Sequence, residues 1–88
     1  MTVHELAVIL VVEARGQLRI GDISAILNVS DGSTGAWVRQ LEQAGIVERF
    51  KDHVNHRWTW VRMTAKGVRL RERARKNNRE VRDGPDVG

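Results

Sequence analysis

The first apolar segment of the chain, residues 3–14, has the length and spacing of a helix. Val3, Leu6 and Leu10 recur along one stripe, and the segment ends at Gly16. Four further apolar residues widen this stripe, namely Val8, Ile9, Val11 and Val12. A helix on the surface of a small domain rarely has so broad an apolar face. We therefore expect this helix either to be buried on two sides or to contact a second chain.

Two helices joined by a tight turn are predicted next. Residues 17–20 form either a short strand or an extended linker, and Asp22 can cap a short helix after them. Asn28 then tolerates the left-handed backbone of a tight turn. The following helix, residues 33–44, ends at Gly45. Two helices joined in this way predict a helix-turn-helix.

The period of the apolar positions then changes to two. Residues 46–51 and 58–63 predict two strands joined by a polar loop, and Thr64 can cap a last helix. Residues 83–88 predict a disordered tail. The order helix, helix, helix, hairpin, helix predicts a mainly α fold with a small β-hairpin. We therefore expect a winged helix-turn-helix domain over residues 1–82.

Composition and charge narrow the class of protein. The 88 residues are enough for one small domain, and the absence of cysteine excludes disulfides and zinc–thiolate sites. The longest apolar run, residues 6–12, is too short for a membrane span, and we expect a cytoplasmic, nucleoid-associated protein. Residues 1–47 contain three basic and five acidic side chains (−2), whereas residues 48–88 contain twelve and six (+6). A basic half favours a polyanionic partner.

Three motifs in register resemble one family. Residues 33–49, STGAWVRQLEQAGIVER, resemble the recognition helix and first wing strand of MarR-type winged-helix regulators. Residues 55–57 fall at the position of that family's Asp-x-Arg wing motif, and residues 63–67 resemble its Leu-Thr-x-x-Gly junction. The resemblance covers about residues 17–72. It implies a winged-helix fold that binds double-stranded DNA.

The chain departs from the family pattern in two places. Members of the family are longer, with extra C-terminal helices that form the dimer, whereas this chain has one basic helix after the wing. Gly35 and Ala36 stand where the family often has Thr or Ser followed by Arg. Without the extra helices we expect no small-molecule effector, and we expect no cofactor.

Candidate DNA contacts lie on the third helix and on the hairpin. Outward-facing side chains of a recognition helix meet base edges in the major groove. Here that set is Ser30, Ser33, Gly35, Ala36, Arg39 and Gln40. Arg39 suits guanine and Gln40 suits adenine, although both also fit a solvated helix face. The basic residues of the hairpin tip are Lys51, His53, His56 and Arg57. Arg57 can enter a minor groove, with Asn55 holding it by a hydrogen bond; the alternative is an ordinary polar turn.

The tryptophans and the last helix each allow two interpretations. Trp37 is expected in the core, whereas Trp58 and Trp60 share the outer face of the hairpin. They pack on the first or last helix, or they form a subunit or partner contact. The arginines of the last helix form a solvated face, or they add charge for nucleic acid. Possible dimer or partner contacts are thus Val8, Val11, Val12, Trp58 and Trp60.

The sequence favours a binding protein over an enzyme. Its three histidines have no cysteine partners, and no phosphate-binding glycine loop or catalytic carboxylate pair is evident, so no catalytic or metal-binding residue is assigned. The hypothesis is a homodimeric, sequence-specific transcriptional regulator of double-stranded DNA, acting as a repressor. The alternatives are an architectural or replication or recombination accessory protein with little base readout, and a winged-helix protein-interaction module.

Overall fold

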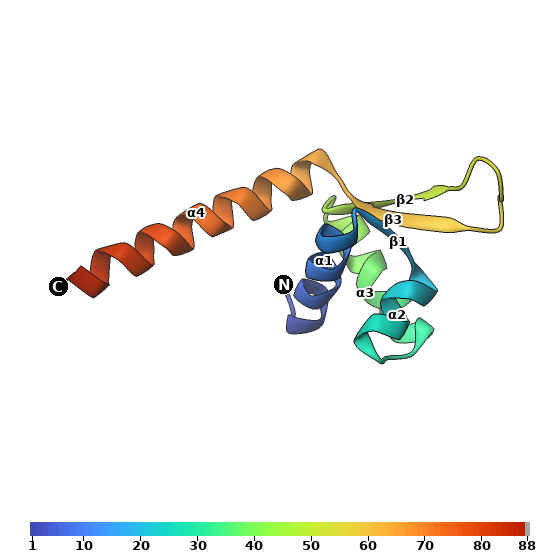
Figure 1. The fold of residues 1–88 in the computed structure, drawn as a ribbon, viewed down its shortest axis with the longest axis horizontal. Coiled ribbons are helices and arrows are strands. Elements are labelled where there is room, and N and C mark those ends of the chain that lie inside the picture. The colour runs from blue at the N-terminus through green and yellow to red at the C-terminus, as the bar shows by residue number, and fades with distance from the viewer. Residues whose placement is uncertain (88) are drawn as a thin grey trace.

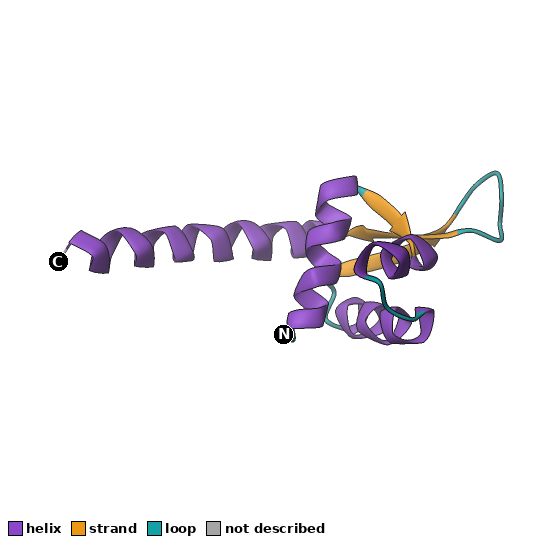
Figure 2. Ribbon diagram, turned by 60° about the horizontal axis from the view of Figure 1, so that its bottom comes forward, coloured by secondary structure: helices purple, strands orange, loops and turns teal. Residues whose placement is uncertain are grey.

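The computed structural model describes the backbone of residues 1–87 and the side chains of residues 1–77. Over this range the chain forms four helices and one antiparallel sheet with strand order β1-β3-β2, as Figure 1 and Figure 2 show. The elements are α1 Val3–Arg15, β1 Gln17–Arg19, α2 Ile20–Leu27, α3 Asp31–Gln43, β2 Val47–Lys51, β3 Thr59–Met63 and α4 Ala65–Val87. The predicted winged helix-turn-helix is confirmed. The segment after α1 is a strand, so the wing belongs to a three-stranded sheet.

The core lies where α1, α2 and α3 meet the inner face of the sheet. Alternate residues of the strands point inward, with Leu18 of β1 paired to Val61 of β3, and Val47 of β2 paired to Met63 of β3. The buried apolar residues are Val8, Ile9, Val12, Leu18, Ile23, Val38, Leu41, Ile46, Val47 and Val61. Burying each such side chain contributes about 1.5–3 kcal/mol.

The inner face of α1 differs from the predicted one. Val8 and Val12 are fully buried in the core of their own domain, and Val11 packs against it. Val8 and Val12 therefore cannot form the predicted contact with a second chain. The exposed apolar residues of α1 are instead those of the predicted inner stripe, Val3, Leu6 and Leu10. Because nearly every position from residue 6 to 12 is apolar, periodicity alone does not determine which side faces the core.

The turn between α2 and α3 follows the prediction, but the start of α2 does not. Asn28 ends α2 in the left-handed region with φ 57°. Arg19, rather than Asp22, occupies the N-cap position of α2. Asp22 lies in the first turn, where its Oδ2 accepts from the backbone N–H of Arg19 at 3.1 Å. The carboxylate therefore caps the helix from inside its first turn.

The junction into α4 is tight and hydrogen-bonded. The Thr64 hydroxyl donates to the carbonyl of Gly45 at 2.6 Å and accepts from the backbone N–H of Gly67 at 2.9 Å, which confirms Thr64 as the cap of this helix. Gly67 is buried, and a Cβ built there would collide with the carbonyl of Ile46. The helix can therefore pack against the backbone at Ile46, just before β2, only because residue 67 has no side chain.

Helix α4 leaves the winged-helix body on the side away from the wing (Figure 1), and the molecule is 55 Å long. Near its start, Arg71 and Arg75 both pair with Glu13 of α1, each at 3.3 Å. The helix is assigned to Val87, and the disordered tail that the sequence predicts over residues 83–88 stays a prediction. Residue 88, the end of that predicted tail, lies outside the described residues. The backbone hydrogen bonds of a helix need no neighbouring element, so the helix extends beyond the body.

Candidate nucleic-acid interface

Helix α3 is held by its buried face and by a cap at its start. Thr34, Val38 and Leu41 are buried, and the Thr34 hydroxyl lies 2.9 Å from the hydroxyl of Ser24 on α2. The Ser30 hydroxyl accepts from the backbone N–H of Ser33 at 3.1 Å and donates to the Ser33 hydroxyl at 3.0 Å. These contacts fix the start of α3 and leave its other face free.

The predicted outward residues of α3 lie on that other face. Ala36, Arg39 and Gln40 are exposed, and Gly35 is half-buried. Trp37, by contrast, packs against the core and stacks on His4 with ring centroids 4.6 Å apart. Among the described side chains no acidic partner lies within ion-pairing distance of Arg39. Its guanidinium is therefore available to a ligand.

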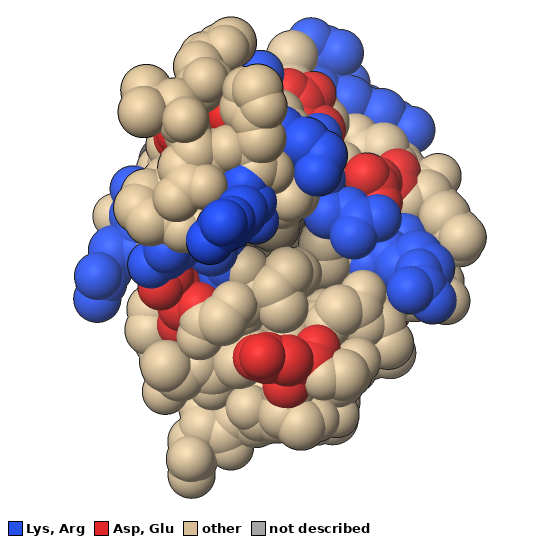
Figure 3. Space-filling model, turned by 90° about the vertical axis from the view of Figure 1, so that its right-hand side faces the viewer, with Lys and Arg blue, Asp and Glu red and all other residues tan. Residues whose placement is uncertain are grey.

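The helix-turn-helix itself contributes little positive charge. Over residues 20–43 the basic residue is Arg39, and the acidic residues are Asp22, Asp31 and Glu42. Figure 3 shows the side of the molecule on which the wing tip lies, where Lys and Arg side chains cross the middle of the face with acidic side chains among and below them. The attraction for a polyanion on this side therefore comes mainly from outside the helix-turn-helix.

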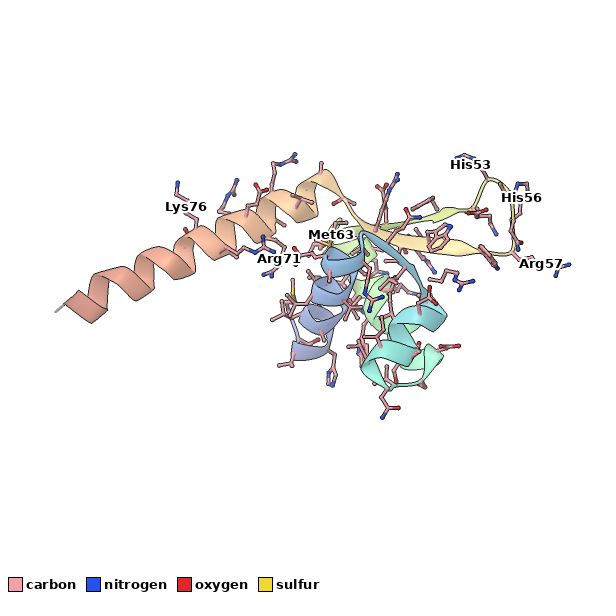
Figure 4. The ribbon with its side chains drawn as sticks, viewed as in Figure 1. His53, His56, Arg57, Met63, Arg71 and Lys76 are labelled. Atoms are coloured by element: carbon pink, nitrogen blue, oxygen red, sulfur yellow. The ribbon has the colours of Figure 1, made fainter. Side chains whose placement is uncertain are left out.

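The wing places the predicted basic residues at its tip. His56 and Arg57 are exposed in the loop after β2, and Lys51 is exposed at the end of that strand. Figure 4 shows His53, His56 and Arg57 at the far end of the wing, with Arg57 pointing away from the body. The Asn55 side chain accepts from the backbone N–H of Arg57 at 3.1 Å. The side chain of Asn55 thus holds Arg57 by a hydrogen bond, as the sequence predicts, and the group it holds is the backbone N–H of Arg57.

One residue at the base of the wing was missed by the sequence analysis. Asp52 follows β2, and its Oδ2 accepts from the backbone N–H groups of Val54 and Asn55 at 2.9 and 2.8 Å. Its Oδ1 accepts from the indole N–H of Trp60 at 3.0 Å. The Asn55 N–H, followed by the Trp60 indole, holds the pKa of Asp52 below its ordinary value. An aspartate at the start of a polar loop is a turn signal that could have indicated this role.

The two outer tryptophans pack around an arginine of β1. The Arg19 guanidinium carbon lies 4.6 Å from the ring centroid of Trp58 and 5.7 Å from that of Trp60, and the two indoles meet edge to face at 6.3 Å. Neither predicted packing surface, the first or the last helix, is used in these contacts. Arg19 also pairs with Asp22 at 3.1 Å, and this hydrogen-bonded pairing lowers the pKa of Asp22.

The described basic side chains at the start of α4 lie at the other end of the molecule from the wing tip. Arg71 and Arg75 are paired with α1, and Figure 4 shows Arg71 pointing toward α1 while Lys76 points the other way. The wing tip lies at the opposite end of the molecule.

An open groove of about 320 Å³ lies beside the junction of α1 and α4. It is lined by Val12, Glu13, Gly16, Arg62, Met63 and Val68. Its two charged residues already have partners, because Glu13 pairs with Arg71 and Arg62 pairs with Glu48 at 2.7 Å. The expectation that the chain takes no small-molecule effector stays a prediction.

The described residues also bear on two further questions, metal sites and membrane-spanning helices. Within them no group of three or more His, Cys, Asp or Glu side chains is placed to hold a metal ion. None of the helices in this part of the chain has the length and hydropathy of a membrane span.

The sequence model of the MarR family matches residues 1–59, which include α1, the helix-turn-helix, β2 and the wing loop. The chain belongs to the MarR family. The family match covers two thirds of the chain and confirms the resemblance to this family, although the motif at residues 63–67 lies outside the matched range. The comparison with curated protein sequences found no match.

Several solved structures share the fold. A mutant MarR from E. coli in complex with operator DNA is 20% identical with a TM-score of 0.79, covering 86% of this chain and 54% of its own. Streptococcus pneumoniae FabT in complex with DNA is 23% identical with a TM-score of 0.78, and the match covers 99% of this chain and 60% of FabT. A MarR-like transcriptional regulator from Thermotoga maritima is 30% identical with a TM-score of 0.74, and the match covers 80% of this chain and 50% of that regulator. This MarR-family chain therefore spans between half and three-fifths of those chains.

Proposed function

We propose that this MarR-family chain binds double-stranded DNA in a sequence-specific way and acts as a transcriptional repressor. The observation that supports this proposal most is that the start of α3 and the tip of the wing lie on the same side of the molecule. Helix α3 starts beside α2 on the side of the molecule toward which the wing tip also points (Figure 1). The structures of E. coli MarR and of FabT described above are complexes with DNA.

In this proposal α3 lies in the major groove of the duplex. Arg39 donates to the O6 and N7 atoms of guanine, and Gln40 makes the paired bonds that suit adenine. Ser33 donates to a phosphate or a base, and Gly35 and Ala36 let the helix backbone come close to a thymine methyl group. The Ser30 hydroxyl caps the helix and lies at the edge of this contact.

The wing supplies a second contact and most of the charge. Arg57 enters the adjacent minor groove or pairs with flanking phosphates, and Lys51 and His56 face the phosphates beside it. The helix-turn-helix has a single basic residue, so the wing determines most of the salt dependence of binding.

We propose further that the chain acts as a homodimer. In this dimer the two copies contact each other through the apolar side chains left exposed on α1 and at the start of α4, which are Val3, Leu6, Leu10, Val68 and Leu70. Two copies then bind half-sites about one helical turn, ~10 bp, apart in an inverted repeat. A Leu10→Lys protein should sediment as a monomer and should lose preference for the full inverted repeat.

Selection from a library of random-sequence duplexes tests the proposed specificity. With the full chain we expect enrichment of an inverted repeat whose half-sites are about one turn apart. An Arg39→Ala protein should tolerate substitutions at one base pair of each half-site and keep its preference elsewhere. Recovery of unrelated sequences by the wild-type chain would exclude a sequence-specific regulator.

One observation favours a second function, an architectural or accessory protein with little base readout. Helix α3 exposes one long basic side chain, that of Arg39, and Gly35 and Ala36 of the same helix have little or no side chain. Such a helix offers few hydrogen-bond donors to base edges. Tight but unselective binding in the library experiment is the result expected for this function.

A further inference from the structure

A single carboxylate organises the loop of the wing. Asp52 accepts three hydrogen bonds, from the backbone N–H groups of Val54 and Asn55 and from the indole of Trp60. Both of its oxygens are therefore used. Two of the bonds fold the loop back on its first residue, and the third ties that residue to strand β3.

The other hydrogen bonds of the loop form only when the loop is folded back on Asp52. The backbone N–H of Asp52 donates to the carbonyl of Trp58 at 2.9 Å, and that of Trp58 donates to the carbonyl of Asn55 at 3.0 Å. The side chain of Asn55 then holds the backbone N–H of Arg57. Burial does not hold the tip, because Val54 is 95% exposed. The direction of Arg57 therefore follows from hydrogen bonds that begin at Asp52.

The tryptophan bound by Asp52 is itself held from the helix-turn-helix side. Trp60 pairs with Arg19 in the β1–β3 register, and the Arg19 guanidinium lies over both outer indoles. The same guanidinium donates to Asp22 in the first turn of α2 at 3.1 and 3.3 Å. Helix α2 in turn packs on α3, the proposed recognition helix, through the Ser24–Thr34 contact. Polar and aromatic contacts thus connect the wing loop to the first turn of α2, and α2 itself connects that turn to α3.

We propose that Asp52 and Trp60 are positioning residues of the DNA interface, which fix the wing loop so that Arg57 meets the duplex in register with α3, with Arg19 joining the two parts. The inference rests on the proposed DNA-binding function. Neither residue needs to touch DNA. The bond between them sets the geometry of a contact that Arg57 makes.

Two phenylalanine substitutions separate this role from general packing. Trp60→Phe keeps an aromatic ring for Arg19 but removes the N–H that Asp52 binds. Trp58→Phe is the matched control, because among the described residues no acceptor lies within hydrogen-bonding distance of the Trp58 indole nitrogen. Affinity for an about 30-bp duplex from the DNA upstream of the gene is measured for both, with thermal unfolding to verify folding. We expect Trp60→Phe to weaken binding about tenfold and Trp58→Phe to change it less than about twofold.

A cycle with Arg57→Ala shows whether the loss acts through the wing. In the Arg57→Ala background, Trp60→Phe should weaken binding by less than about twofold, because the contact that it positions is already absent. A tenfold loss that persists in this background overturns the proposal, as does a Trp60→Phe protein that binds like the wild type. Should Trp60→Phe fail to fold, Asp52→Asn takes its place in the same cycle with the same expectations.

A measurement without DNA distinguishes failure of this inference from failure of the proposed function. In a ¹⁵N-labelled sample the indole N–H signal that disappears in Trp60→Phe belongs to Trp60. That signal should shift in Asp52→Asn while the Trp58 signal stays, and an unmoved Trp60 signal overturns the proposal. If the wild-type chain binds no duplex at all, the proposed function fails, and the role of Asp52 and Trp60 in DNA binding fails with it.

Discussion

The wing and α4 leave the same core in opposite directions, but different contacts attach them to it (Figure 1). At the base of α4, Gly67 lies directly against the carbonyl of Ile46, and Glu13 forms ion pairs in which its side chain is only 19% exposed. At the base of the wing, Arg19 and Trp58 are about 40% exposed and are joined by cation–π and hydrogen-bond contacts. We therefore expect changes at the base of α4 to lower folding stability and changes in the wing to lower DNA affinity.

Gly67→Ala should have the largest effect on stability. The added Cβ would meet backbone atoms of Ile46, which can move only if α4 shifts, so we expect a loss of about 3 kcal/mol in the free energy of unfolding. Urea denaturation followed by circular dichroism measures it. Gly35→Ala is the matched control, because its Cβ meets nothing within 4 Å and alanine should add up to about 1 kcal/mol in a helix. Equal stability of Gly67→Ala and the wild type would contradict the close fit of α4.

In the wing and on α3 the expected effects are on binding. Arg39→Ala and Arg57→Ala should each weaken operator binding about 10- to 100-fold, while the free energy of unfolding stays within about 0.5 kcal/mol of the wild type. Fluorescence anisotropy with labelled duplexes checks both. Lys76→Ala removes one positive charge from α4, at the end of the molecule away from the wing. We expect this variant to bind within about threefold of the wild type. If all three variants bind alike, the proposed interface is wrong.

Glu13→Gln tests the ion pairs that hold α4 against α1. Removing a partly buried charge that faces two arginines should cost about 1–2 kcal/mol of stability. Glu48→Gln is the comparison, because the Glu48–Arg62 pair is about half exposed and should contribute less than about 0.5 kcal/mol. Chemical denaturation at low and high salt measures both. The account predicts a larger loss for Glu13→Gln at each salt concentration, and the reverse order would contradict it.

The smallest expected effect is a pH dependence at the base of the wing. The folded-state pKa values of Asp22 and Asp52 lie below their ordinary value of 3.8. Their contribution to stability is therefore complete above about pH 4, and it is lost as the pH falls through the folded pKa. The urea midpoint of the wild type should fall below pH 4 more steeply than that of an Asp22→Asn, Asp52→Asn protein. Parallel curves for the two proteins would show that the carboxylates contribute nothing.

Local signals in the sequence were enough to predict the fold and the outward face of α3. Asn28 indicates the left-handed turn after α2, and Thr64 indicates the cap of α4, because each residue type acts on its own neighbourhood. The three motifs in register identify the family that the comparison confirms. The exposure of Ala36, Arg39 and Gln40 follows from the helical spacing of the buried residues between them.

Contacts between distant residues could not be predicted in the same way. The buried side of α1 depends on which side meets the sheet, since Leu10 and Val12 are equally apolar and only one is buried. The pairing of Glu13 with Arg75 spans 62 residues, and the arginines of α4 give no local signal of which ones turn toward α1. The links from Arg19 to the outer tryptophans depend likewise on strand pairing. Such contacts form only when the chain is folded, so no periodic pattern records them.

The dependence of DNA affinity on salt tests the central claim most directly. Binding of the wild-type chain is measured with the duplex from upstream of its gene and with a scrambled duplex of equal length. The account predicts that log affinity falls linearly with log salt, with a slope of about −4 for several phosphate contacts, and that the upstream duplex is bound at least about 10³-fold more tightly. A steep slope without preference would leave only the accessory function. Absence of binding to either duplex at low salt would contradict the account.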